Sequence, residues 1–201
     1  MKYIMKSSLL TLSILFFSMG YAQNTSETLP YHQIPDAPEQ YSPGSVAARF
    51  IDGLGYRYYW ATEGLTKKEL DFSPSADARN AIETLEHIYD LSTTILNASL
   101  NRPNEKQADA PARTFAETRK QTLLNLQKAS QLIRGKNEKE LAALTIIFKR
   151  GDKEITYPYW NMMNGPIADA IYHVGQIVSF RRSAGNPMNP KVSVFTGKNR
   201  S

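Results

Sequence analysis

The sequence predicts an all-α protein: a four-helix bundle with a long crossover between helices two and three and a small β-hairpin before helix four. Four long segments repeat apolar residues at helical spacing. A polar stretch with two prolines separates the second from the third, and β-branched residues precede the fourth. The alternative is a larger α+β arrangement, in which the hairpin belongs to a real sheet.

The first 22 residues have the three parts of a secretory signal peptide. Lys2 and Lys6 are basic, residues 8–19 are apolar, and Gly20-Tyr21-Ala22 places small residues at the cleavage site. An uncleaved anchor is the alternative, but the apolar run is shorter than the ~20 residues of a membrane-spanning helix. We therefore expect an exported bacterial protein, periplasmic or secreted, with no stable membrane anchor after cleavage.

Composition excludes several classes of function. Loss of Lys2 and Lys6 with the signal peptide lowers the formal net charge from +5 to +3, and the remaining basic residues are dispersed. Without a basic patch and interleaved aromatics, nucleic acid is not an expected partner. The chain has no cysteine, so it has no lipid-anchoring residue, disulfide, thiol nucleophile or thiolate ligand. Any metal must be held by nitrogen and oxygen atoms.

Residues 23–44 form an extended leader, because four prolines block helix formation there. The first helix covers about 45–63 with Ser45 as its N-cap, and Gly53 and Gly55, which weaken it locally, indicate close packing. Its apolar stripe is Val46, Phe50, Leu54 and Tyr58. The second helix covers about 75–98, with an apolar stripe of Ala78, Ala81, Ile82, Leu85, Ile88 and Tyr89.

The polar segment 101–112 is a loop or crossover. Thr114 and Glu117 form a capping-box pattern that opens a third helix over about 115–135. Residues 139–144 are ambiguous, and the β-branched runs around Arg150-Gly151-Asp152 predict the hairpin. The fourth helix covers about 166–184, or begins near Trp160 with Pro166 as a kink. The bundle thus spans 45–185, and 186–201 is an irregular tail.

Two helices carry polar stripes that contain histidine. On the fourth helix, Asp169, His173, Gln176 and Phe180 lie opposite the apolar stripe, and Asp169 and His173 are at i and i+4. On the second helix, the polar stripe is Asn80, Glu83, His87, Asp90 and Thr94. If the stripes face each other, His87, Asp169 and His173 form a two-histidine, one-carboxylate site for Zn²⁺, Fe²⁺, Ni²⁺ or Mn²⁺.

Plain surface roles are the alternatives for these residues. A polar stripe opposite an apolar one is typical of any surface helix. His87 then pairs with Glu83 and Asp90 on its own helix, and Asp169 with His173 forms a surface pair. Phe180 in the same stripe argues against full exposure of that stripe to solvent. His32, which lies in the leader, is interpreted as having no role in the site.

Two segments resemble the DinB-like superfamily of metal-binding four-helix bundles: AIETLEHIYDLS, and YPYWNMMNGPIADAIYHVGQIVSFRRSAG, which is similar to the pattern H-x-x-x-H-x-G-Q. The resemblance implies a divalent metal held by three histidines near one end of the bundle. His87 and His173 match two of them, whereas Asp169 stands where the first histidine of the pattern is expected. The aspartate favours a harder ion than three imidazoles, or indicates that metal binding has been lost.

The same resemblance implies thiol S-transferase or thiol-dependent isomerase chemistry, although low-molecular-weight thiols are mainly cytoplasmic. We expect a metal-dependent hydrolase or transferase that acts on a small molecule, with Gln176 orienting a ligand or the substrate. The alternatives are a non-catalytic extracytoplasmic bundle that binds a small ligand, and a structural bundle with a solvated seam. The sequence identifies no catalytic residue and leaves the oligomeric state open, a homodimer included.

Overall fold

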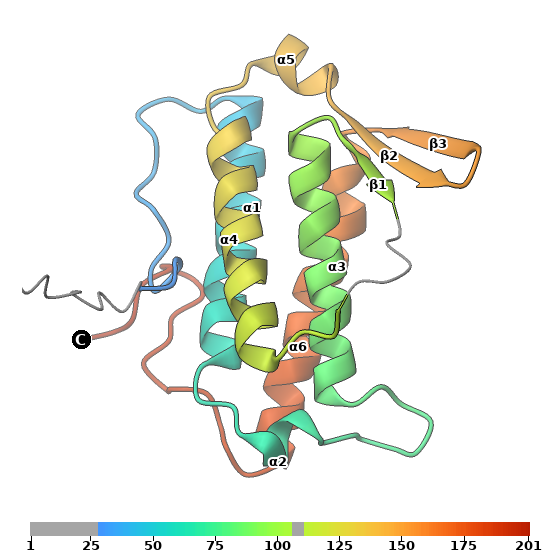
Figure 1. Ribbon diagram of the computed structural model, residues 1–201. Helices are drawn as coiled ribbons and strands as arrows, with labels where there is room; N and C mark the ends of the chain where they lie inside the picture. Colours follow the sequence, from blue (N-terminus) through green and yellow to red (C-terminus); the bar gives the residue numbers. More distant parts are fainter. Residues whose placement is uncertain (1–27, 106–110) are drawn as a thin grey trace, which may run out of the picture.

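The computed structural model describes residues 28–105 and 111–201, and the predicted signal peptide lies outside them. Four long helices lie side by side: α1 (Pro43–Thr62), α3 (Ala81–Ser99), α4 (Phe115–Ile133) and α6 (Ala168–Ser183) (Figure 1). Two short helices, α2 (Lys67–Leu70) and α5 (Glu138–Ala142), lie in the connections, and a π-helical turn, η1 (Met163–Ile167), precedes α6. No helix within the described residues is long and apolar enough to span a membrane.

The prediction of an all-α bundle is wrong, because the molecule also has a three-stranded mixed sheet. Its strands are β1 (Pro103–Glu105), β2 (Thr145–Arg150) and β3 (Lys153–Pro158), in the order β1-β2-β3. β2 and β3 form an antiparallel hairpin, while β1, which comes from the crossover, pairs parallel to β2. The fold is therefore mixed α and β, and the hairpin belongs to a sheet.

Tertiary contacts hold β1 in place. The Asn104 amide nitrogen donates a hydrogen bond to the Ile147 carbonyl, and the Asn97 amide nitrogen donates to Asn104 Oδ1. The side-chain oxygen of Asn101, a residue with φ of 52°, accepts hydrogen bonds from the backbone N–H and hydroxyl of Thr145. The partners on β2, Thr145 and Ile147, are more than 40 residues away in the sequence, so local propensity did not reveal the strand.

Capping boxes set where several helices begin. Thr114 and Glu117 cap α4, as predicted. The N-cap of α1 is Ser42 and not Ser45 as predicted, because Ser45 is the third residue of the same capping box. The box that opens α3 is formed by Asn80 and Glu83. The second helix therefore begins at residue 81, about six residues later than predicted.

The first helix buries a different face from the one predicted. Val46 and Phe50 are exposed, whereas Leu54 and Tyr58 are buried, together with Ala47, Ala48 and Ile51. The start of α1 lies very close to the end of α4, since a Cβ atom on Gly44 would be 2.2 Å from the Ile133 carbonyl oxygen. Small residues therefore make this contact, and the large ones at 46 and 50 lie outside it.

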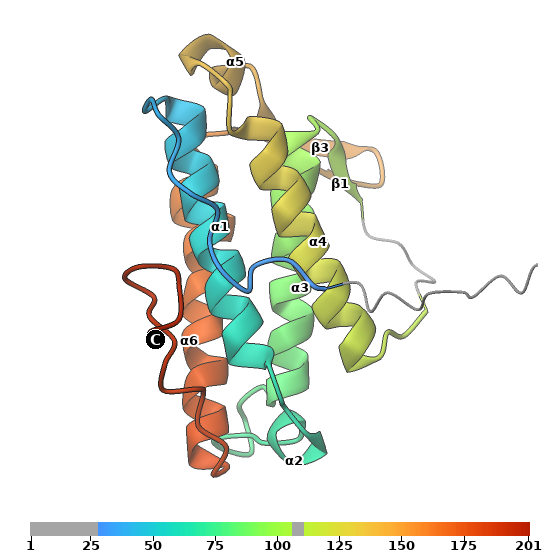
Figure 2. The same cartoon turned by 90° about the vertical axis from the view of Figure 1, so that its left-hand side faces the viewer.

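The leader and the tail both pack on α1 (Figure 2). The Ile34 N–H donates to the Gly197 carbonyl, and the Tyr56 hydroxyl donates to the Asn199 side chain. The Tyr31 ring lies against Gly55, where a Cβ atom would be 2.4 Å from the ring. This contact explains Gly55, one of the two glycines within the helix.

One buried side chain fixes the far end of α6. Arg181 is 4% exposed, and its Nη1 donates to the carbonyl oxygens of Trp60 and Ala61 at the end of α1, at 3.0 Å each. Its Nε donates to the Asn186 carbonyl at 2.7 Å. The last carbonyl groups of a helix have no hydrogen-bond partner within it. Arg181 donates to two such groups of α1 and thereby anchors α6 to that helix.

Candidate metal centre

A kink positions the start of α6. Within η1, Gly165 has non-helical torsion angles (φ −93°, ψ −111°), and Pro166 cannot donate a backbone hydrogen bond. The helix therefore bends at this point, in agreement with the interpretation of Pro166 as a kink. Asp169 follows in the first turn of α6. A π-helical turn shifts the side chains that follow it around the helix axis, and such turns are frequent at functional sites.

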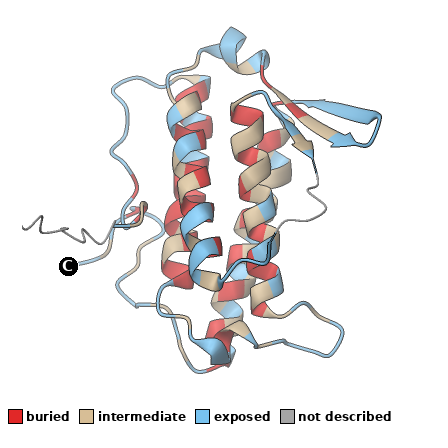
Figure 3. Ribbon diagram, viewed as in Figure 1, coloured by how far each residue is buried: buried red, intermediate tan, exposed pale blue. Residues whose placement is uncertain are grey.

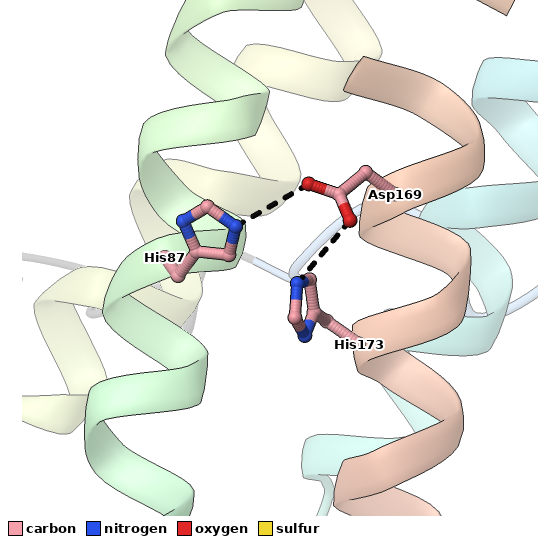
Figure 4. Close-up of side chains that lie close together, drawn as sticks. All are labelled: His87, Asp169 and His173. Atoms are coloured by element: carbon pink, nitrogen blue, oxygen red, sulfur yellow. Dashed lines mark hydrogen bonds and ion pairs between the residues drawn. The ribbon is translucent and has the colours of Figure 1, made fainter. Parts of the chain in front are cut away.

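α3 and α6 bring the three predicted ligands together (Figure 4). The Nε2 atom of His87 lies 3.3 Å from Asp169 Oδ2, and the Nε2 atom of His173 lies 3.3 Å from Asp169 Oδ1. The two imidazole rings are nearly perpendicular, with centroids 4.6 Å apart. The carboxylate thus contacts both histidines, and its two oxygens are used separately.

These distances suit a shared cation. One ligand atom from each residue can be chosen so that all three lie within 4.8 Å of one another. Around an ion with ligands at ~2.1 Å, tetrahedral geometry places neighbouring ligand atoms about 3.4 Å apart. Each imidazole lies 3.3 Å from one oxygen of Asp169, which is close to that value although the two oxygens differ. His87, Asp169 and His173 therefore form a cluster that could hold a metal ion.

Gln176 sets the orientation of His173. Its Oε1 atom accepts a hydrogen bond from His173 Nδ1 at 2.7 Å. Because Nδ1 carries that proton, the lone pair of Nε2 is free and faces the carboxylate of Asp169. A proton or a metal ion between Nε2 and Asp169 Oδ1, which are 3.3 Å apart, could bridge the two atoms. Gln176 therefore contacts a ligand and not the ion position itself.

The cluster is open to solvent on one side. The side chains of His87, Asp169 and His173 are 31%, 44% and 13% exposed. Tyr172, which is largely exposed, places its ring edge-to-face with His173 at 5.3 Å between centroids. An ion held by three ligands at this depth keeps coordination positions for water or for a ligand from solution.

The contacts of His87 differ from those of a plain surface histidine. Its ion-pair partner is Asp169 on the facing helix, not Glu83 or Asp90 on its own helix. Glu83 instead accepts a hydrogen bond from the backbone of Asn80 in the capping box. The third histidine, His32, packs with Tyr59 and Trp60 and is not a member of the cluster.

Two aromatic residues near the metal-ligand cluster, Phe72 and Tyr172, were not identified from the sequence. Phe72 packs against Phe180, which the helical wheel placed in the polar stripe, with ring centroids 5.7 Å apart. Phe72 lies in the connection before α3, where no periodicity marks its direction. Tyr172 carries no pattern that would link it to the ligands, apart from its position next to His173.

No protein-family model matches the chain, and no curated protein matches its sequence. The chemistry of the three side chains is therefore the main guide to function. Two neutral imidazoles and one carboxylate provide a donor set for divalent first-row metals. Such a set, when it leaves positions open, serves either to activate a small molecule or to bind one.

Proposed function

We propose that the protein is a divalent-metal-dependent enzyme of the DinB-like superfamily, with hydrolase or thiol-transferase chemistry at His87, Asp169 and His173. The observation that carries the proposal is the position of these ligands on two facing helices, with donor atoms within 4.8 Å of one another. The neighbouring Gln176 supports it, because metal-bound histidines commonly donate their other ring N–H to an acceptor.

The ion is one of Zn²⁺, Ni²⁺, Mn²⁺ and Fe²⁺. The carboxylate makes the donor set harder than three imidazoles would be, and two histidines with one carboxylate are also the ligands of non-haem Fe²⁺ enzymes. For a given set of nitrogen and oxygen ligands, affinity rises from Mn²⁺ through Fe²⁺ to Ni²⁺, and Zn²⁺ lies below Cu²⁺. In vitro we therefore expect Zn²⁺ and Ni²⁺ to bind more tightly than Mn²⁺.

The side chains of the site have separable tasks. His87 and His173 supply nitrogen donors from different helices, and Asp169 supplies negative charge between them. Gln176 holds the His173 ring, and Tyr172 presents an exposed aromatic face beside it. A divalent ion held there would polarise a carbonyl group or lower the pKa of a water or thiol ligand. If the chain is exported, hydrolysis is favoured over thiol transfer, since thiols are scarce outside the cytoplasm.

A second candidate is a non-catalytic binding protein for a small ligand. It is favoured by the exposure of the cluster, because Asp169 is 44% exposed and enzymes usually enclose the reacting groups. Two cavities of the described residues, of about 1570 and 280 Å³, are lined by residues other than the three ligands. In this case the metal would contribute affinity for a ligand rather than catalysis.

Metal binding to untagged protein tests the proposal. Isothermal titration with Zn²⁺ and Mn²⁺, together with elemental analysis, should give one equivalent per chain. We expect His87→Ala, Asp169→Ala and His173→Ala each to weaken binding more than about 100-fold, beyond the effect of losing a neighbouring hydrogen bond. Matched controls are His32→Ala and Asp90→Asn, which replace a histidine and an exposed carboxylate outside the cluster.

Uptake of none of Zn²⁺, Ni²⁺, Mn²⁺ and Fe²⁺ by the wild type, or equal losses in the controls and the ligand variants, would refute the metal centre. If the metal binds, turnover on panels of esters, amides and thiol acceptors separates the two candidates. Activity that is lost in Asp169→Ala supports the enzyme. Stoichiometric metal without turnover on any panel supports the binding protein.

A further inference from the structure

β3 is an edge strand with an open side. It is the last strand in the order β1-β2-β3, and all six of its residues are exposed, as Figure 3 shows for the outer strand of the hairpin. Within residues 28–105 and 111–201, no hydrogen bond joins β3 to any element other than β2. Exposed edges of this kind are templates for pairing with another strand.

The hairpin loop determines which backbone groups point outward. Only Gly151 and Asp152 separate the strands, and Arg150 pairs with Lys153. In a two-residue hairpin the flanking pair exchanges both hydrogen bonds, and bonded pairs then alternate along the ladder. Lys153, Ile155 and Tyr157 therefore bond to β2.

The alternate residues of β3 are free on their backbone. Glu154 and Thr156 direct their N–H and C=O groups away from β2. Pro158, which has no N–H, lies at a position where β2 requires none. The outer edge thus offers two donors, at Glu154 and Thr156, and three acceptors, since the Pro158 carbonyl also points outward.

We propose that β3 pairs antiparallel with β3 of a second copy of this chain, about a two-fold axis at Ile155. In this register Glu154 of each copy exchanges both backbone hydrogen bonds with Thr156 of the other. Ile155 faces its own symmetry mate, and Lys153 faces Tyr157. The two three-stranded sheets join into one sheet of six strands.

The sequence of β3 favours this register, and it favours a second copy of the same strand as the partner. A two-fold axis at Glu154 would oppose two carboxylates, which is destabilising. An axis at Thr156 would place Pro158 opposite Glu154, where its missing N–H loses a bond. The axis at Ile155 uses both outward donors and the outward carbonyls of Glu154 and Thr156, and it opposes no like charges. A strand that is complementary to itself in this way suits a symmetric interface between identical chains.

Apolar exposure on the strand supports the same pairing. Ile155 and Tyr157 are 53% and 42% exposed, and pairing covers Ile155 with its symmetry mate. The surface involved is small in comparison with stable interfaces, so the dimer forms in a concentration-dependent manner. The metal ligands lie on α3 and α6, so this inference does not depend on the proposed function.

Sedimentation velocity over a range of concentrations tests the pairing with the intact protein. The wild type should shift toward twice the monomer mass as concentration rises. Thr156→Pro removes the outward N–H but no bond to β2, whereas Thr156→Ala keeps it. We expect Thr156→Pro to weaken dimerisation at least about tenfold, through two symmetry-related bonds, and Thr156→Ala to leave it nearly unchanged. A monomeric wild type, or equal association of the two variants, would overturn the proposal.

Cross-linking gives a second test that does not rely on the proline variant folding. Because the chain has no cysteine, Ile155→Cys introduces a single thiol. At the two-fold axis the Cα atoms of a non-bonded pair lie about 4.5 Å apart, within disulfide range. Lys153→Cys is the matched control, since the two copies of residue 153 lie four residues apart, about 13 Å. Oxidation should yield covalent dimer from Ile155→Cys only, and equal yields or none would reject the register.

Discussion

Asp52 on α1 and Asp169 on α6 each face another helix, and their surroundings differ. Asp52 is 1% exposed and lies 2.8 Å from Arg134 Nη2, while the Tyr31 hydroxyl donates to its other oxygen at 3.1 Å. Asp169 is 44% exposed and meets two imidazoles, at 3.3 Å each. Asp52 thus has a permanent positive partner within the protein, whereas Asp169 belongs to a cluster that could hold a metal ion from solution.

The different partners imply different roles. A buried carboxylate is costly unless it is paired and hydrogen-bonded, so Asp52 and Arg134 must both be present for the fold to be stable. Burial, with Asp52 as a second cause, raises the pKa of Tyr31, so the phenol remains a hydrogen-bond donor. Asp169 can lose its partners at little cost, since water reaches it. The first carboxylate belongs to the core, and the second belongs to the candidate site.

The largest expected effect comes from breaking the buried pair. Asp52→Ala should lower the free energy of unfolding by about 3 kcal/mol, near the lower end for a broken buried pair because Arg134 retains some access to water. Asp169→Ala in metal-free buffer should cost less than about 1 kcal/mol, as expected for an exposed pair. Urea unfolding of both variants measures the difference. Equal losses would contradict the contrast between the two carboxylates.

When metal is added, the gain in stability should depend on Asp169 and not on Asp52. At a free Zn²⁺ concentration of 100 times Kd, the wild type should gain about 2.7 kcal/mol of stability. Asp169→Ala should gain almost nothing. Asp52→Asn, which keeps an acceptor for Tyr31, should gain as much as the wild type. Thermal unfolding with Zn²⁺ and with EDTA checks this, and a metal response that survives in Asp169→Ala would place the ion elsewhere.

A smaller effect is expected when the support of His173 is removed. Gln176→Ala takes away the acceptor on Nδ1 and should weaken metal binding by about 10–100-fold while the stoichiometry stays at one. Gln176→Glu keeps an acceptor at the same length and should retain most of the affinity. Calorimetric titration distinguishes the two variants. Wild-type affinity in Gln176→Ala would mean that the hydrogen bond does not orient the ligand.

The smallest effect is expected for Glu69, whose carboxylate accepts hydrogen bonds from neutral groups. The hydroxyl and backbone N–H of Thr66 donate to it and lower its pKa from 4.5 to about 2. The charged form is therefore favoured in the folded state, so its contribution to stability is full above pH 4.5 and is lost as the pH falls toward 2. Glu69→Gln should flatten the pH dependence of unfolding in this range. If stability falls between pH 4.5 and 2 in Glu69→Gln as it does in the wild type, the capping box does not contribute to the pH dependence of unfolding.

The sequence allowed the local features of the fold to be predicted. The third helix is marked by Thr114 and Glu117, and the hairpin by β-branched residues on either side of a turn with Gly151, whose φ is +58°. These signals depend on neighbouring residues alone. β1 lacks such a signal, because its pairing with residues 147–149 comes from a segment more than 40 positions away.

The face of the first helix was misjudged for a related reason. Val46 and Phe50 follow helical spacing, yet the close approach at Gly44 directs the small residues inward. In the candidate site, Asp169 and His173 were visible as an i, i+4 pair, and His87 followed from matching the two polar stripes. The distance between the stripes depends on how α3 packs with α6, and so does the contact of Phe72 with Phe180. Periodicity within one helix carries no information on either.

Arg181 anchors α6 at one of its two ends only. Its guanidinium fixes the last turns to the end of α1, whereas the opposite end begins at the non-helical Gly165 and at Pro166. If an ion binds to Asp169 and His173, we expect any adjustment to its radius to occur at the start of α6, near Asp169, because Arg181 holds the other end.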